Sequence, residues 1–175
     1  MKEKYILRKV YLSAVAVLLS IGWAAGQPRA VSVRLGWISE LSYQHTLGPG
    51  FLEVGAGIPW LAACPTVTAT YNYIPWTFRN DVGGVFDIYF GGGLGVGTFI
   101  FPCGRGIEVY PVGGGIEVYP VGGVVVPVGF QFRTASHFLL SISWRPMFGA
   151  FFSDVRPVWY KQGLYDGGLT LGYAF

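Results

Sequence analysis

The chain has 175 residues, of which 52% are hydrophobic and 12% are charged, with 27 glycines and a formal net charge of +3. Lys2, Lys4, Arg8 and Lys9 hold four of the twelve basic residues and Glu3 is one of the nine acidic residues, so the rest of the chain is formally neutral. That balance leaves no basic patch and argues against nucleic acid as a partner. The absence of a second long apolar run excludes a helical membrane protein.

The N-terminus predicts a secretory signal peptide over residues 1–26. Its basic start precedes the mostly apolar segment Val10–Ile21, and Ala24 and Gly26 suit the small-residue positions of a cleavage site. The apolar part is shorter than the roughly 20 residues that a membrane-spanning helix needs. We therefore expect export, cleavage before the glutamine that follows, and a single domain over residues 27–175.

The remaining chain predicts an all-β fold, because apolar residues alternate with small or polar ones in eight segments and none shows a helical apolar stripe. The segments are Val31–Trp37, Glu40–His45, Phe51–Pro59, Val67–Ile74, Phe86–Gly97, Val124–Phe132, Phe138–Trp144 and Gly167–Phe175. The break between the first two is the least marked. We place it near Trp37–Ser39 because this gives an even number of segments. Bacterial membrane barrels made of one chain, the architecture that the alternation indicates, have an even number of strands.

The kind of alternation indicates a membrane barrel. In the fifth segment Phe86, Ile88 and Phe90 share one face, whereas Asp87, Tyr89 and four glycines share the other. Apolar residues outside and small or polar residues inside define a transmembrane antiparallel up-and-down β-barrel. A β-sandwich with one wet face would alternate similarly, but it would not need both a signal peptide and a terminal Phe. We predict an eight-stranded barrel.

The last segment resembles the C-terminal assembly signal of bacterial outer-membrane barrels, with Phe175 at the end and Tyr173 two positions before it. Together with Val33–Trp37, Leu41–His45 and Ser141–Pro146, this ending is similar to small outer-membrane barrels of Bacteroidota, in the class of the OmpA membrane domain and OmpX. The resemblance implies an outer-membrane location, with membrane lipid and the barrel-assembly machinery as partners. It implies no particular activity.

The lengths of the connections predict which end faces outward. With both termini in the periplasm, the short turns Thr46–Gly50, Trp76–Gly83 and Thr134–His137 are periplasmic. The outer connections are then Leu61–Thr66, Pro102–Gly123 and Met147–Tyr165. Short periplasmic turns and longer outer loops are typical of such barrels.

The predicted outer loops carry a repeat and two cysteines. Gly106–Gly114 is copied as Gly115–Gly123, which predicts a lengthened hairpin; an exposed edge for a partner strand and a duplication without a role both remain open. Cys64 and Cys103 fall in different outer loops, where a disulfide and two separate thiols remain open alternatives.

Aromatic residues are frequent in the same loops. They predict either a binding surface, for an extracellular protein or glycan, or anchors at the membrane interface. The leading candidates are Tyr110, Tyr119, Trp159 and Tyr160.

Parity aims six charged residues into the predicted lumen, three acidic and three basic: Arg34, Glu40, Glu53, Asp87, Arg133 and Arg145. Charges in so narrow a space need partners, because isolated burial costs several kcal/mol per ion. We expect an ion-pair network that plugs the lumen. An eight-stranded barrel is just wide enough to be filled by side chains, which disfavours a porin but leaves a small-ion leak open.

These features favour a structural or surface-binding protein over an enzyme. The alternative is a lipid-modifying enzyme, which would need a base beside a hydroxyl, yet His45 and His137 both fall at predicted periplasmic turns. A narrow channel is the third hypothesis for the function, after a structural or surface-binding protein and a lipid-modifying enzyme. The two cysteines and two histidines are too scattered to predict a metal site, and we expect no cofactor.

Overall fold

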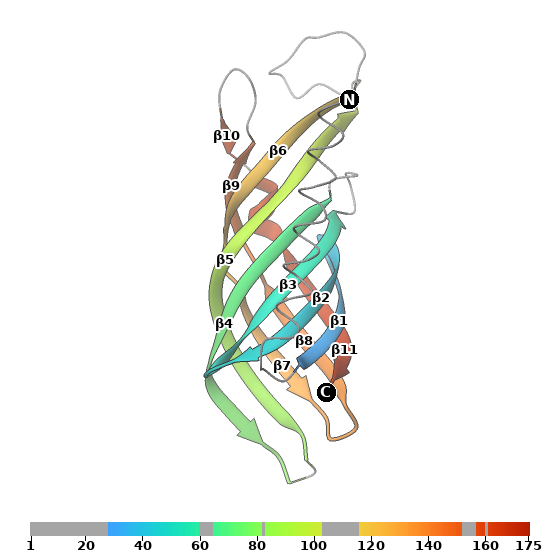
Figure 1. The fold of residues 1–175 in the computed structure, drawn as a ribbon, viewed down its shortest axis with the longest axis vertical. Helices are drawn as coiled ribbons and strands as arrows, with labels where there is room; N and C mark the ends of the chain where they lie inside the picture. The colour runs from blue at the N-terminus through green and yellow to red at the C-terminus, as the bar shows by residue number, and fades with distance from the viewer. Residues whose placement is uncertain (1–27, 60–64, 82, 103–115, 152–156, 160) are drawn as a thin grey trace, which may run out of the picture.

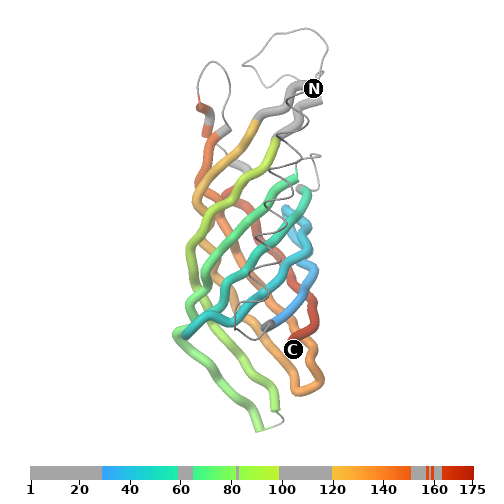
Figure 2. The backbone as a smooth tube through the Cα atoms, in the orientation of Figure 1, coloured from blue at the N-terminus to red at the C-terminus, as the bar shows by residue number. Residues whose placement is uncertain are grey.

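The computed structural model describes residues 28–59, 65–81, 83–102, 116–151, 157–159 and 161–175. They form one antiparallel sheet that closes on itself as a barrel (Figures 1 and 2). In this part of the chain, no helix is long and apolar enough to cross a membrane. The predicted signal peptide, residues 1–26, lies outside the described residues.

The barrel has eight strands, as predicted. Six are continuous: β1 (Pro28–Gly36), β2 (Ile38–Leu47), β3 (Gly50–Pro59), β4 (Thr66–Arg79), β5 (Val85–Pro102) and β11 (Gly167–Ala174). The other two consist of paired segments: β6 (Ile116–Val125) with β7 (Val128–Arg133), and β8 (Phe138–Trp144) with β9 (Met147–Phe151). A two-residue strand, β10 (Val158–Trp159), pairs with β9, and one 3₁₀ turn, η1 (Lys161–Tyr165), precedes β11.

Proline explains both interruptions. Pro127 separates β6 from β7 and Pro146 separates β8 from β9, and proline lacks the N–H that a central strand position needs. Backbone bonding continues across the gaps, since Val126 N donates to Pro146 O at 3.0 Å and Gly91 N donates to Pro127 O at 2.8 Å. Each pair of segments therefore acts as one barrel strand.

Closure comes from two sets of pairings. β1 pairs with β2 on one edge and with β11 on the other. β5 pairs with β4 on one edge, and its other edge pairs with β7 over Val85–Phe90 and with β6 over Gly93–Pro102. The predicted break between the first two strands is confirmed, at Trp37.

Apart from the one-residue break at Trp37, the connections are longer at one end of the barrel than at the other. The turns after β2, β4 and β7 lie at the end that holds the C-terminus, which we call the short-turn end, and the connections after β3, β5 and β9 lie at the opposite, long-loop end (Figure 1). Gly48 and Gly83 adopt φ values of 57° and 82° in two of the short turns. Glycine tolerates this left-handed backbone without steric cost.

Three connections are shorter in the structure than the sequence predicted, because parts of them belong to strands or to the 3₁₀ turn. β4 continues to Arg79, beyond an irregularity between Tyr73 and Trp76, because Trp76 and Phe78 pair with Ile88 and Phe86 of β5. The second copy of the repeat lies in β6, where its alternating residues extend the ladder with β5. The predicted loop Met147–Tyr165 likewise contains β9, β10 and η1.

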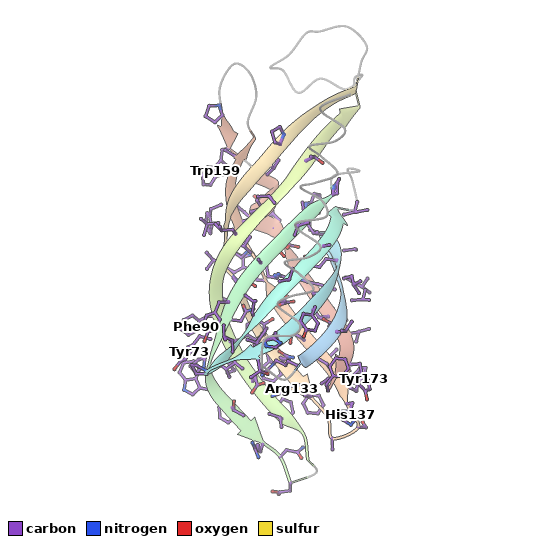
Figure 3. The ribbon with its side chains drawn as sticks, in the orientation of Figure 1. Tyr73, Phe90, Arg133, His137, Trp159 and Tyr173 are labelled. Atoms are coloured by element: carbon purple, nitrogen blue, oxygen red, sulfur yellow. The ribbon has the colours of Figure 1, made fainter. Side chains whose placement is uncertain are left out.

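The two faces of the wall differ as the alternation predicted. Outward residues are exposed and apolar, for example Leu41 at 61%, Leu94 at 66% and Ile142 at 64%. Tyr73, Phe90 and Tyr173 lie toward the short-turn end, whereas Trp159 lies toward the long-loop end (Figure 3). So large an apolar exterior needs a nonaqueous partner, and a barrel meets that need in a bilayer.

Glycines on the inner face let adjacent strands approach. A Cβ at Gly93 would collide with the carbonyl oxygen of Ala69 on β4, whereas a Cβ at its neighbour Gly92 would meet nothing within 4 Å. The β4–β5 ladder at this level therefore depends on the missing side chain of Gly93.

We expect Gly93→Ala to destabilise the barrel by about 1–3 kcal/mol, because the added methyl group forces the two strands apart. Gly92→Ala is the matched control and should leave stability unchanged or slightly raised. Urea unfolding of the refolded protein in detergent, followed by heat-dependent gel migration, measures both. Equal stability of the two variants would contradict the close approach.

Candidate functional site in the barrel lumen

The lumen collects eight charged side chains, four arginines and four carboxylates. Six are the predicted residues, of which Arg34, Glu40, Glu53, Asp87 and Arg145 are buried and Arg133 is partly buried. The other two, Arg29 and Asp166, are also buried and were not predicted. The eight residues form three groups along the inside of the wall.

The central group joins one arginine to two glutamates. Arg145 Nη1 donates to Glu40 Oε1 and lies 3.7 Å from Glu53 Oε1, while its Nη2 donates to Thr68 Oγ1 at 3.3 Å. Gly55 makes room for this group, since a Cβ there would lie 2.6 Å from Glu40 Oε1. Strands β2, β3 and β4 are thereby tied to the break between β8 and β9, across the barrel.

The second group pairs Arg34 with Asp166 next to the start of β11. Arg34 Nη1 donates to both carboxylate oxygens of Asp166, at 2.9 and 3.0 Å, and Nη2 donates to its backbone oxygen at 3.0 Å. Arg34 Nε also donates to Ser143 Oγ at 3.3 Å, and Ile38 N donates to Asp166 Oδ1 at 3.3 Å. Asp166 stands between η1 and β11, outside any alternating segment, so parity could not assign it a face.

The third group is centred on Asp87 near the short-turn end. Arg29 and Arg133 donate to its Oδ2 at 2.6 and 2.8 Å, and Thr77 Oγ1 donates to its Oδ1 at 2.8 Å. The Arg29 guanidinium also lies 4.7 Å from the ring centre of Phe51. Arg29 lies two residues before Val31, where the predicted first strand begins, so the alternation does not assign Arg29 a face.

Neutral polar residues line the lumen as well. Gln131 Nε2 donates to Gln44 Oε1 at 3.2 Å, and the hydroxyls of Tyr89 and Ser141 lie 3.2 Å apart. Gly129 leaves space for the Tyr89 ring, with which a Cβ at that position would collide. These two polar contacts join inward-facing side chains of strands that are not neighbours in the sheet, β7 with β2 and β5 with β8.

The two histidines lie outside this network. His45 Nδ1 is 3.3 Å from the Tyr43 hydroxyl, and His137 Nδ1 is 2.8 Å from the backbone oxygen of Ala174. Neither contact pairs an imidazole with a serine, the arrangement that the lipid-modifying alternative would use. In the described part of the chain, no three His, Cys, Asp or Glu side chains gather as metal ligands would.

His137 instead helps to hold the C-terminal strand. Its ring stacks on Tyr173 with centres 5.2 Å apart, and Tyr173 packs edge-on against Phe175 at 5.4 Å. Ala174 N donates to the His137 backbone oxygen at 2.7 Å. The two residues of the predicted assembly signal thus lie together on the turn that leads into β8.

Some of the remaining candidates lie among the described residues and some lie outside them. Cys64, Cys103, Tyr110 and Tyr160 lie outside the described residues. Tyr119 was assigned to a loop wrongly: it belongs to β6, where the alternating repeat pairs it with Phe99 of β5. Trp159 lies in β10, 51% exposed, with its ring centre 6.4 Å from that of Phe148.

Comparison with solved structures finds the same kind of barrel. The N-terminal β-barrel domain of Pseudomonas aeruginosa OprF is similar to this chain, with a TM-score of 0.50 and 13% sequence identity, over 86% of this chain and 99% of that one. No protein-family model matches the chain, and no curated protein is similar to it in sequence. The likeness shows the fold alone. It is an OmpA-like eight-stranded barrel, a fold consistent with an outer-membrane location.

We expect Arg145→Met to destabilise the barrel by about 3–5 kcal/mol, because it leaves Glu40 and Glu53 buried without their cation. Replacing both glutamates by glutamine in the same protein should restore most of that loss, since no uncompensated charge remains. Arg79→Met, at an exposed position, is the control and should change stability by less than about 0.5 kcal/mol. Urea unfolding measures all three, and an unrestored loss in the triple variant would contradict the charge argument.

Proposed function

We propose that this chain is an outer-membrane β-barrel with a plugged lumen, which has a structural role in the membrane and presents its long-loop end for interactions at the cell surface. The observation that carries the proposal is the reversed polarity of the wall. Charged residues are buried inside, and Val, Leu, Ile and aromatic residues are exposed outside. A lipid bilayer is the environment that makes this arrangement stable.

The plug is supported by the way the charges are connected. Arg145, Glu40 and Asp87 make contacts that cross from one part of the wall to another, at separations of 46 to 105 residues in sequence. The two Arg145 bonds join parts of the wall that are not neighbours in the sheet, whereas Arg133 and Asp87 lie on the paired strands β7 and β5. All three bonds fill space in a barrel that is only wide enough for side chains. We infer that the lumen carries no large solute.

The surface role is supported by the long-loop end. Strand pairing between β5 and β6 continues to Pro102 and Ile116, whereas β4 pairs with β5 only as far as Gly97 and β9 pairs with β6 only as far as Val121. Among the described strands, this two-stranded ribbon therefore extends beyond its neighbours and presents backbone edges. Such edges accept partner strands.

Exposed aromatic side chains at the same end fit a binding surface for an extracellular protein or glycan. Trp159 is 51% exposed and Tyr165, in η1, is 76% exposed. Aromatic residues with one polar group suit both interfaces and membrane boundaries. The signal peptide, assembly by the barrel-assembly machinery, a Cys64–Cys103 bridge and an origin in Bacteroidota remain predictions from the sequence.

The orientation predicts which segments an antibody reaches. An epitope inserted between Gly113 and Gly114, in the connection after β5, should be labelled on intact cells. The same epitope inserted after Asp81, in the turn after β4, should be labelled only after the outer membrane is permeabilised. The reverse pattern would contradict the orientation. If neither tagged protein can be detected in the outer-membrane fraction, the proposed location is wrong.

The plug predicts a low conductance. Purified barrel in a planar bilayer should show conductance far below that of a 16-stranded porin measured in the same bilayer, because the lumen of an eight-stranded barrel is filled. Heat-dependent gel migration of the same sample is the control for correct folding. Open-channel steps of porin size from folded protein would refute the plug.

A further inference from the structure

The group at the short-turn end is not balanced by its own residues. Arg29 and Arg133 both use Nη2 to donate to one atom, Oδ2 of Asp87, at 2.6 and 2.8 Å. The second carboxylate oxygen is taken by the Thr77 hydroxyl at 2.8 Å. Two guanidinium groups share one carboxylate, so the group carries an excess of one positive charge.

Each of these arginines also keeps a buried donor without a partner. The Nε atoms of Arg29 and Arg133 are inaccessible to solvent and make no hydrogen bond within the described residues. Arg29 as a whole is 8% exposed. Buried polar atoms are rarely left unpaired, and an unpaired donor on a charged group is especially costly.

The other described carboxylates of the lumen are bound elsewhere. Glu40 and Glu53 face Arg145, and Asp166 is held by Arg34. The excess positive charge and the two unpaired Nε donors therefore occur together, on Arg29 and Arg133. An acceptor that carries negative charge would satisfy both.

The position of the group gives it access from one side. Arg133 is the last residue of β7 and lies toward the short-turn end (Figure 3). Arg29 is the second residue of β1, a strand that begins beside the C-terminal residues of β11 at the same end. The Arg133 side chain retains 26% exposure. Because the side chains point into the lumen, a small soluble species fits this route better than a lipid headgroup.

We propose that Arg29 and Arg133 form a binding site for a compact oxyanion of the phosphate type, which enters from the short-turn end, where the partly exposed Arg133 side chain turns aside to uncover the buried Nε atoms, and which then accepts hydrogen bonds from both. The planar guanidinium group matches phosphate in charge and geometry. Each Nε lies beside the Nη2 that already binds Asp87, so the oxyanion extends the existing ion cluster. The proposal rests on the barrel alone and not on the surface role.

The test is the stability of the refolded barrel as a function of inorganic phosphate, in a detergent without phosphate and at ionic strength held constant with sodium chloride. A ligand that binds only the folded state raises the unfolding midpoint in a saturable way. Wild type and Arg79→Gln, altered at an exposed arginine of the same end, should both show this rise. Arg133→Gln should abolish it, because Arg29 and Asp87 then balance each other.

Asp87→Asn provides a variant of opposite sign. It increases the excess positive charge, so phosphate should reach half of its effect at a lower concentration than in wild type. No saturable rise in wild type, or an equal rise in Arg133→Gln, would overturn the proposal.

Anomalous diffraction from wild-type crystals soaked in selenate gives a second readout that does not depend on any variant folding. A selenium peak within hydrogen-bond distance of both Nε atoms supports the site. A water molecule in that place, without selenium, overturns it.

Discussion

The structure depends on one constraint: charge that enters an eight-stranded barrel must be neutralised by other charge inside it. The interior is too narrow to hydrate ions freely, and an isolated buried ion costs several kcal/mol. Arg34 and Arg145 are 1% and 3% exposed, and each is held by acidic side chains: Arg34 by Asp166, which precedes the neighbouring strand β11, and Arg145 by Glu40 of the more distant strand β2. Two of the ion pairs, Arg145–Glu40 and Arg29–Asp87, join strands that share no backbone bonds, and they therefore fix the relative positions of those strands across the barrel.

The same constraint explains where small residues occur. A long inward side chain needs space beside it on the neighbouring strand, and glycine provides that space. Gly55 lies against Glu40, Gly168 against Arg34 and Gly129 against Tyr89. Large polar and minimal side chains alternate around the wall as complementary parts of one packed interior, so close packing and charge balance select the residues jointly.

Much of this could be predicted from the sequence, because a period of two is a local property. Alternation located all eight strands, and the six charges that it directed into the lumen are buried or partly buried. It failed where the period is interrupted. The irregularity between Tyr73 and Trp76 hid the end of β4, and Arg29 and Asp166 lie at the margins of strands, where only the closed structure shows which way they point. Partner choice across the lumen depends on the register of the whole barrel, which no short segment contains.

The low similarity to the OprF barrel domain follows from the same physics. Thirteen per cent identity suffices for a common fold because alternation and strand number, rather than particular residues, specify a barrel wall. The wall is consequently a poor carrier of specific function. Residues at the ends of the wall are less constrained by folding. The short-turn end carries the pair Arg29 and Arg133, whose Nε donors have no partner among the described residues. The long-loop end carries the β5–β6 ribbon, with exposed aromatic residues near it. We therefore expect chemistry that is specific to this chain at the two ends of the barrel. The wall between them, with its buried ion pairs, fixes the distance from one end to the other.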